Sequence, residues 1–135
     1  MKDFINVGLL GAGTVGGGVL KVLEKNAEKI AKEVGKPVRI TKVLDRHVDR
    51  LKQEYGDKYI FTDNADEVLE DKDIDIIVEL LGREHPAKEF IARAFANGKH
   101  VVTPNKAVLA KFGTELLPLA HEHNCDFMFE ASVCG

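Results

Sequence analysis

The chain has 135 residues, of which 44% are hydrophobic and 30% charged, and its formal net charge is −3. Such a composition is typical of a globular domain with its own core, and it offers no basic surface for a nucleic acid. No stretch approaches the ~20 apolar residues of a membrane span, and the two cysteines, Cys125 and Cys134, form no C-x-x-C pattern. We therefore expect a cytoplasmic protein with free thiols and no signal peptide.

The first predicted strand, Ile5–Leu10, runs directly into a glycine-rich segment. This segment, Gly11 to Gly18, has the spacing G-x-G-x-x-G and leads into a long helical pattern, which Gly35 and Pro37 end. A strand, a glycine turn and a helix in this order predict the pyrophosphate-binding turn of a dinucleotide site. A glycine turn that serves packing alone is the alternative.

The glycines of this turn have separate physical reasons. Gly11 permits the tight turn, Gly13 lets the backbone approach a pyrophosphate, and Gly16 lets the helix pack close to the strand. The free N–H groups at the helix start then face the phosphates. The residues predicted to line the pyrophosphate are Gly11, Ala12, Gly13, Thr14, Val15 and Gly16.

The middle of the chain alternates between strand and helix patterns. Strands are predicted at Val38–Leu44, Tyr59–Phe61 and Ile74–Leu81, and helices at Asp49–Tyr55 and around Val68 and Leu69. The strand at 74–81 is the most apolar, as expected for one that is buried on both faces of a parallel sheet.

The last third of the chain continues this alternation. A helix is predicted from Pro86 to Asn97, a strand at His100–Thr103, two short helices at Ala107–Ala110 and Thr114–His123, and a strand at Phe127–Glu130. Six strands with helical crossovers predict a doubly wound (Rossmann) α/β fold, with a mostly parallel sheet in the order 3-2-1-4-5-6 and helices on both faces. We expect one dinucleotide-binding domain over residues 1–135.

Two adjacent charges, Asp45 and Arg46, follow the second predicted strand, where the adenosine ribose of a dinucleotide would lie. An acidic side chain there accepts a hydrogen bond from the ribose 2′-OH of NAD, whereas an arginine pairs with the 2′-phosphate of NADP. Because both are present, the sequence leaves NAD and NADP open. Both charges can also be solvated loop residues.

Lys106 follows the fifth predicted strand at its carboxyl end, where ligands bind to open α/β sheets. Its charge would stabilise negative charge that develops on a carbonyl oxygen during hydride transfer. A surface lysine at a helix start is the alternative, although a cation is electrostatically unfavourable there. Asn105 is predicted either to contact the cofactor or to cap the helix.

Four segments resemble the cofactor-binding half of homoserine dehydrogenase. They are Gly11–Gly16, Val78–Gly82, Gly98–Lys106 and Phe129–Val133, in the order in which they occur in that family. The family interconverts aspartate 4-semialdehyde and homoserine with NAD or NADP, in threonine and methionine biosynthesis. The sequence differs at Arg83, where the family usually has a second glycine, and at Cys134, where it usually has a smaller residue.

The resemblance implies roles for individual residues. Lys106 corresponds to a lysine that contacts the cofactor and acts in the active site, so it is the predicted catalytic residue. Gly82 and Thr103 lie in segments expected at the cofactor, and Arg46 corresponds to a position linked to NADP use. Glu130 and the carbonyl groups of Val133 and Gly135 correspond to a site for a monovalent cation, such as sodium.

Complete members of the family are longer, with a region that binds the amino-acid aldehyde and forms a homodimer. Nothing in these 135 residues resembles that region, so we expect the chain to bind a dinucleotide with little or no turnover. Other oxidoreductases of this architecture and a non-catalytic dinucleotide sensor are the alternatives. A sensor needs the glycine turn but has no evident use for Lys106 at the nicotinamide end.

Overall fold

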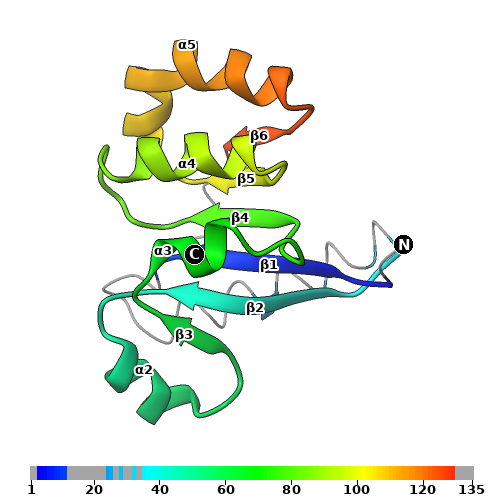
Figure 1. Cartoon of the computed structure of the whole chain (residues 1–135), viewed down its shortest axis with the longest axis vertical. Helices are drawn as coiled ribbons and strands as arrows, with labels where there is room; N and C mark the ends of the chain where they lie inside the picture. The colour runs from blue at the N-terminus through cyan, green and yellow to red at the C-terminus, as the bar shows by residue number, and fades with distance from the viewer. Residues whose placement is uncertain (1–2, 12–23, 26–27, 29–31, 33–34, 130–135) are drawn as a thin grey trace.

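The computed structural model of the chain describes residues 3–11, 24, 25, 28, 32 and 35–129. Within them lies one six-stranded sheet in the order β3-β2-β1-β4-β5-β6, with every neighbouring pair parallel (Figure 1). The strands are β1 (Ile5–Leu10), β2 (Val38–Leu44), β3 (Ile60–Thr62), β4 (Ile76–Glu79), β5 (His100–Thr103) and β6 (Phe127–Phe129). The predicted fold class and strand order are confirmed.

The described helices lie on both faces of this sheet. They are α2 (Val48–Tyr55), α3 (Ala65–Leu69), α4 (Ala87–Ala96) and α5 (Lys106–Glu122). In Figure 1, α4 and α5 lie together near β5 and β6, whereas α2 lies at the far end of the sheet beside β3. Most of the predicted first helix, between residues 15 and 34, lies outside the described residues.

The strands separate two apolar clusters because successive side chains of a strand point to opposite faces of the sheet. Ile77 packs with Phe95 and the inner faces of α4 and α5, whereas the next residue, Val78, packs with Leu9 and the α2 residue Leu51. Both clusters consist of side chains that are almost completely buried. The burial of β4 on both faces therefore accounts for the apolar pattern that predicted it.

The prediction of two separate helices after β5 is wrong, because α5 is one helix of 17 residues. Its buried face repeats every four residues, which continues one apolar stripe through the expected break. That face consists of Val108, Phe112, Leu116 and Ala120. Gly113 is buried within the helix with open space where a Cβ would lie, and the exposed Pro118 does not end the helix.

Other element boundaries differ by one or two residues. β4 is two residues shorter at each end than predicted, since Ile74 and Leu81 pack into the core without joining the ladder. β3 begins at Ile60 and ends at Thr62, one residue later than predicted at each end. The predicted final residue of the last strand, Glu130, lies outside the described residues.

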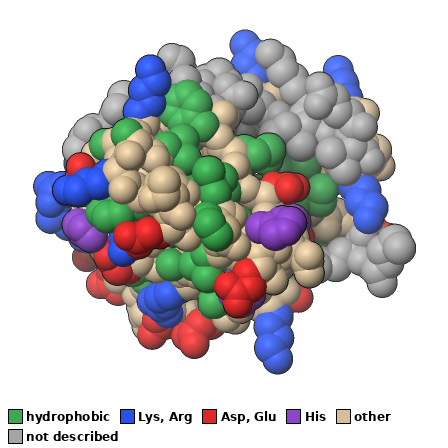
Figure 2. Space-filling view, turned by 90° about the horizontal axis from the view of Figure 1, so that it is seen from above, with side chains coloured by type: hydrophobic (Ala, Val, Ile, Leu, Met, Phe, Trp, Pro, Cys, Tyr) green, Lys and Arg blue, Asp and Glu red, His purple; other side chains and the backbone are tan. Residues whose placement is uncertain are grey.

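The α4 and α5 helices present a surface of mixed charge. Figure 2, seen from the α5 side, shows hydrophobic side chains between positive and negative ones. Ion pairs join the two helices and the loop before α4: Lys88 Nζ lies 2.8 Å from Glu115 Oε2, and Lys111 Nζ lies 2.9 Å from Glu84 Oε2. These exposed pairs contribute little to stability, so the apolar face beneath them holds α4 against α5.

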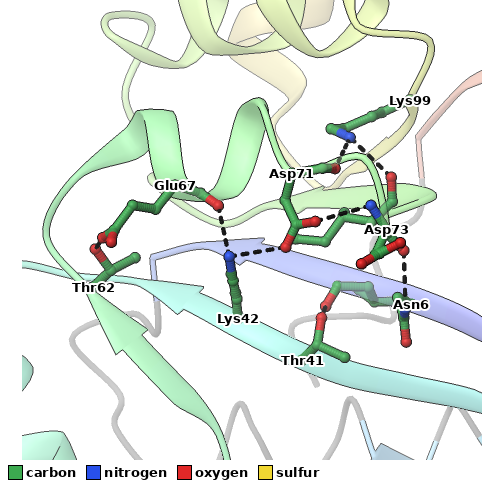
Figure 3. A network of polar contacts seen from close by, with 10 residues as sticks. Asn6, Thr41, Lys42, Thr62, Glu67, Asp71, Asp73 and Lys99 are labelled. Atoms are coloured by element: carbon green, nitrogen blue, oxygen red, sulfur yellow. Dashed lines mark hydrogen bonds and ion pairs between the residues drawn. The ribbon is translucent and has the colours of Figure 1, made fainter.

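A network of polar side chains fixes the chain where it enters β4 (Figure 3). We call it the β4-start network and define it as Asn6, Lys42, Asp71, Asp73 and Lys99. The buried Lys99 donates from Nζ to the carbonyl oxygens of Asp71 and, at 2.9 Å, Ile74. Lys42 Nζ lies 2.9 Å from Asp71 Oδ2, and Asn6 Nδ2 donates to the Asp73 carbonyl oxygen at 2.9 Å. Opposite charges are thus paired at this end of β4.

Candidate dinucleotide-binding site

The predicted site residues that the structure describes gather at one edge of the sheet. β1, β2, β4 and β5 are parallel, so their carboxyl ends lie at the same edge. Gly11, Asp45, Gly82 and Asn105 each lie within three residues of one of these ends. The strand order reverses between β1 and β4, and the crevice at such a switch point is where open α/β sheets bind ligands.

Gly11 has a backbone conformation that favours glycine, in a tightly packed place. Its N–H donates to the Leu44 carbonyl oxygen at 2.7 Å, and its φ is 91°, in the left-handed region that favours glycine. A Cβ there would lie 3.2 Å from Leu81 Cδ2 and 3.4 Å from the Leu80 carbonyl oxygen. The main chain thus turns tightly between two strand ends, which is the geometry that the turn of a dinucleotide site requires. Residues 12–16 lie outside the described residues.

The ends of β2 and β3 border a groove of about 540 Å³. Its lining is mostly polar, with three basic side chains, Arg46, Arg50 and Lys52, and two acidic ones, Asp49 and Asp63. Asp45 lies at the base of the same turn, where its N–H donates to the Thr62 carbonyl oxygen at 2.9 Å. Its Oδ1 accepts a hydrogen bond from the His47 N–H at 2.8 Å. Arg46 is exposed in this groove, and Asp45 is partly engaged in shaping the turn.

A second polar network lies at the other end of β4. We call it the β4-end network and define it as Glu79, Thr103 and Asn105. Glu79 is fully buried, and its Oε2 accepts a hydrogen bond from Thr103 Oγ1 at 2.9 Å. Its Oε1 accepts from Asn105 Nδ2 at 3.5 Å, and the backbone N–H groups of Leu81 and Gly82 also donate to the carboxylate. The last residues of β4 and β5 are thereby tied together.

Burial raises the pKa of Glu79 above its ordinary value, because a carboxylate loses its hydration inside the protein. The hydrogen bonds from Thr103, Asn105 and the two backbone N–H groups offset only part of this effect. Glu79 was not among the predicted site residues. A carboxylate at the end of the most apolar strand is the signal that could have indicated it, because burying a charge costs free energy unless other groups pair with it.

Asn105 is the N-cap of α5, which is one of its two predicted roles. Its Oδ1 accepts from the Val108 N–H at 3.2 Å, and its own N–H donates to Thr103 Oγ1 at 3.0 Å. Its Nδ2 also donates to the Arg83 carbonyl oxygen at 3.1 Å. The side chain is therefore engaged on several sides and buried, and a direct contact with a cofactor remains a prediction.

Lys106 is exposed at the first position of α5, directly after this cap. The first turn of α5, all of which the structure describes, carries no acidic side chain that would offset the positive charge. A cation at the positive end of a helix is unfavourable by itself. The arrangement therefore presents an ammonium group at the sheet edge that carries the other predicted site residues.

The family model described as "Homoserine dehydrogenase, NAD binding domain" matches residues 11–130. The chain belongs to this family. The homoserine dehydrogenase of Methylobacillus glycogenes is 50% identical over 115 residues, which are 85% of this chain and 28% of that protein. The homoserine dehydrogenase of Bacillus subtilis is 41% identical over 131 residues, 97% of this chain and 30% of that protein.

A solved structure gives the same result. The crystal structure of a homoserine dehydrogenase from Thiobacillus denitrificans superimposes with a TM-score of 0.83 at 44% sequence identity, and the match covers 95% of this chain and 30% of that chain. The chain thus spans less than a third of the length of these relatives. The resemblance to homoserine dehydrogenase is confirmed, as is an NAD-binding domain that uses NAD or NADP.

The predictions of a cation site, of free thiols and of no membrane span concern other parts of the chain. Glu130, Val133 and Gly135, the predicted cation ligands, lie outside the described residues, as does Cys134. Cys125 is buried with a free thiol. Among the described residues, no cluster of three or more His, Cys, Asp or Glu side chains could hold a metal ion. None of the described helices combines the length and the apolar character needed to cross a membrane.

Proposed function

We propose that this chain is the dinucleotide-binding part of a homoserine dehydrogenase, which interconverts L-aspartate 4-semialdehyde and L-homoserine by hydride transfer. The observation that carries the proposal is the convergence of the Gly11 turn, Arg46 and Lys106 on one sheet edge, in a chain of this family. Gly11 has a φ of 91°, and this left-handed conformation gives the tight turn that a pyrophosphate-binding segment requires.

In this proposal the site extends along the carboxyl edge from the ribose to the nicotinamide. The pyrophosphate binds at Gly11 to Gly16, and the adenosine ribose binds beside Asp45 and Arg46. The nicotinamide half lies by Gly82 and by the segment Thr103 to Lys106. The ammonium group of Lys106 stabilises charge on the reacting carbonyl oxygen as hydride moves between nicotinamide and substrate.

We further propose that NADP binds better than NAD. The groove at the ends of β2 and β3 is lined by three basic side chains, Arg46, Arg50 and Lys52, and by two acidic ones, Asp49 and Asp63, so basic side chains are in excess. One oxygen of Asp45, the acidic side chain that would favour NAD, accepts a hydrogen bond from the His47 N–H. A 2′-phosphate carries two more negative charges than a hydroxyl at neutral pH, and a guanidinium group binds it through charge-assisted hydrogen bonds.

The substrate, the proton donor and the homodimer contact belong to the longer protein in this proposal, because the chain covers only 28–30% of its relatives. The predicted cation site and cytoplasmic location are part of the same proposal. The 135-residue chain is expected to bind a dinucleotide without oxidising homoserine. Homoserine-dependent formation of NADPH by the purified chain, followed by absorbance, would contradict this division of labour.

Calorimetric titration with NADPH and NADH tests the binding site directly. Replacing Arg46 by alanine should weaken NADPH binding by about tenfold or more, since hydrogen bonds to charged groups contribute ~1.5–3 kcal/mol, and should leave NADH binding nearly unchanged. Arg39→Ala is the matched control, because Arg39 is another exposed arginine of the same half of the sheet and stacks on Phe4.

Two outcomes would contradict parts of the proposal separately. If neither dinucleotide binds to the unmodified chain, the site itself is wrongly assigned. If Arg46→Ala and Arg39→Ala affect NADPH equally, the site stands but Arg46 does not bind the 2′-phosphate.

A further inference from the structure

We propose that Glu79 is a positioning residue for the nicotinamide half of the site. Its buried carboxylate holds the loop after β4 against the start of α5, and it thereby sets where Lys106 lies. This inference rests on the proposed function in one respect, namely that Lys106 faces the nicotinamide end of a bound dinucleotide.

The first argument is the kind of partner that surrounds Glu79. The contacts of the carboxylate all come from donors: the Thr103 hydroxyl, the Asn105 amide and the backbone N–H groups of Leu81 and Gly82. In the described part of the chain, no cation is paired with it. An ionised carboxylate has only acceptor sites, about four of them, so four converging donors match its ionised form.

The second argument is the path from Glu79 to Lys106. Asn105 donates to Glu79 with the same Nδ2 that donates to the Arg83 carbonyl oxygen, while its Oδ1 caps the Val108 N–H. A shift of this side chain therefore moves the first turn of α5. Lys106 is the next residue in the chain and the first of that helix.

The third argument is that the Glu79 carboxylate also holds the loop that follows β4, at Leu80 to Gly82. Leu81 and Gly82 donate to Glu79 through their N–H groups, and the Leu80 N–H donates to the Leu10 carbonyl oxygen at 2.8 Å. Leu81 Cδ2 would lie 3.2 Å from a Cβ on Gly11, so the Leu81 side chain packs closely against the glycine turn. Glu79 thus fixes a loop that borders the glycine turn as well as the helix that begins with Lys106.

The cost of this arrangement favours a role in the site over a role in stability. A buried carboxylate without a cation loses its hydration, and well-packed apolar residues often stabilise a fold at least as well as buried charge. Burial raises the pKa of Glu79, which reflects this cost. A carboxylate gives what an apolar side chain lacks, namely one acceptor that orders donors from two loops and a helix start.

The first experiment measures the position of the α5 start without any ligand. In Glu79→Gln the size is kept, but an amide group faces the donors and at least one of them loses its acceptor. Amide hydrogen exchange at neutral pH, followed by NMR, should become about tenfold faster at Val108 relative to Leu116, which lies deeper in the same helix. Thr103→Val removes one donor to Glu79 and also the acceptor of the Asn105 N–H, so it should raise the exchange rate at Val108 as well.

The second experiment separates the two halves of the ligand. Calorimetric titration compares NADPH with the 2′-phosphate of ADP-ribose, which lacks the nicotinamide. Glu79→Gln should weaken NADPH binding about tenfold and leave binding of the shorter ligand within about twofold. A variant that only lowers the folded population would weaken both ligands equally. Lys99→Met, at the opposite end of β4, is the control for that general effect.

The outcomes are distinguishable. Equal loss of both ligands in Glu79→Gln, or unchanged exchange at Val108 in both Glu79→Gln and Thr103→Val, would overturn the positioning role. If the unmodified chain binds neither ligand, the proposed function fails, and hydrogen exchange alone decides whether Glu79 positions the α5 start.

Discussion

The two ends of β4 hold buried charge in opposite ways. At the β4-start network the cations Lys42 and Lys99 meet a carboxylate and carbonyl oxygens. At the β4-end network the Glu79 carboxylate meets only neutral donors among the described residues. The paired charges at the start of β4 hold the loop before the strand in place. A buried carboxylate without a cation, such as Glu79, costs stability, and we infer that it serves to orient the groups around it. Glu79 lies at the edge that carries the candidate site.

The pKa values of two carboxylates show the same contrast. Burial alone would raise the pKa of Asp71, but hydrogen bonds from Lys42 Nζ and the Asp73 N–H, with the charges of Lys42 and Lys99, bring it below its ordinary value. Burial raises the pKa of Glu79, and neutral donors do not reverse this. The partner, more than the carboxyl group, decides the direction of the shift.

The largest expected effect is the loss of the buried cation at the start of β4. Lys99→Met should lower the free energy of unfolding by about 3 kcal/mol, because two carbonyl oxygens lose charge-assisted hydrogen bonds. Chemical denaturation measures this, and Lys111→Met is the control, since Lys111 pairs with Glu84 at the surface. NADPH affinity of the folded protein should not change. A loss similar to that of the control would show that the β4-start network is not structural.

Two asparagine caps sharpen the comparison at the other end of β4. Asn105 and Asn64 both accept a backbone N–H at a helix start, but Asn64 is exposed and Asn105 is buried in the β4-end network. Asn64→Ala should cost ~1 kcal/mol, the usual contribution of a cap. Asn105→Ala should cost ~2 kcal/mol, because the Arg83 carbonyl oxygen and Glu79 also lose a donor. Equal losses of unfolding free energy would mean that the network adds nothing to the cap.

Acid should affect the two networks with opposite sign. The pKa of Glu79 in the folded state lies above its ordinary 4.5, so the folded state binds its proton more tightly. Its contribution to stability therefore grows as the pH falls through the folded value and is complete below 4.5. The pKa of Asp71 lies below its ordinary 3.8, so its contribution is present above 3.8 and is lost as the pH falls through the folded value.

Denaturation at a series of pH values measures both contributions, with Glu79→Gln and Asp71→Asn as the variants. In wild type, the Glu79 contribution to the free energy of unfolding increases as the pH falls, and this increase should be absent in Glu79→Gln. The Asp71 contribution decreases as the pH falls, and this decrease should be absent in Asp71→Asn. If both variants changed the pH dependence of stability in the same direction, the cations beside Asp71 and the neutral donors to Glu79 would not account for the difference between the two networks.

Local patterns in the sequence predicted the strands and the edge at which the site residues meet. Parallel strands with short connections leave one edge for their carboxyl ends, so Asp45, Gly82 and Lys106 could be brought together without coordinates. The continuity of α5 was missed because two short helices were predicted, at Ala107–Ala110 and Thr114–His123, whereas the apolar stripe from Val108 to Ala120 runs through one helix.

The polar networks could not be predicted in the same way. Glu79 lies 24 residues from Thr103 and 26 from Asn105, and no local periodicity links them. In the sequence Lys99 looks like an ordinary lysine after a helix, yet it is 2% exposed, because carbonyl oxygens 25 and 28 residues away accept hydrogen bonds from its Nζ. Such contacts arise from the packing of the finished fold, which alternation and spacing do not encode.

The smallest expected effect tests how local the β4-end network is. Arg83 contributes its backbone carbonyl oxygen to Asn105, and its side chain is exposed. Arg83→Ala should therefore change the free energy of unfolding by no more than ~0.5 kcal/mol. Arg83→Gly should cost up to ~1 kcal/mol, because glycine gives the unfolded chain more freedom. Since both variants keep the carbonyl oxygen, a loss in Arg83→Ala as large as that in Asn105→Ala would place the Arg83 side chain inside the network, and the positioning of Lys106 would then depend on more than Glu79.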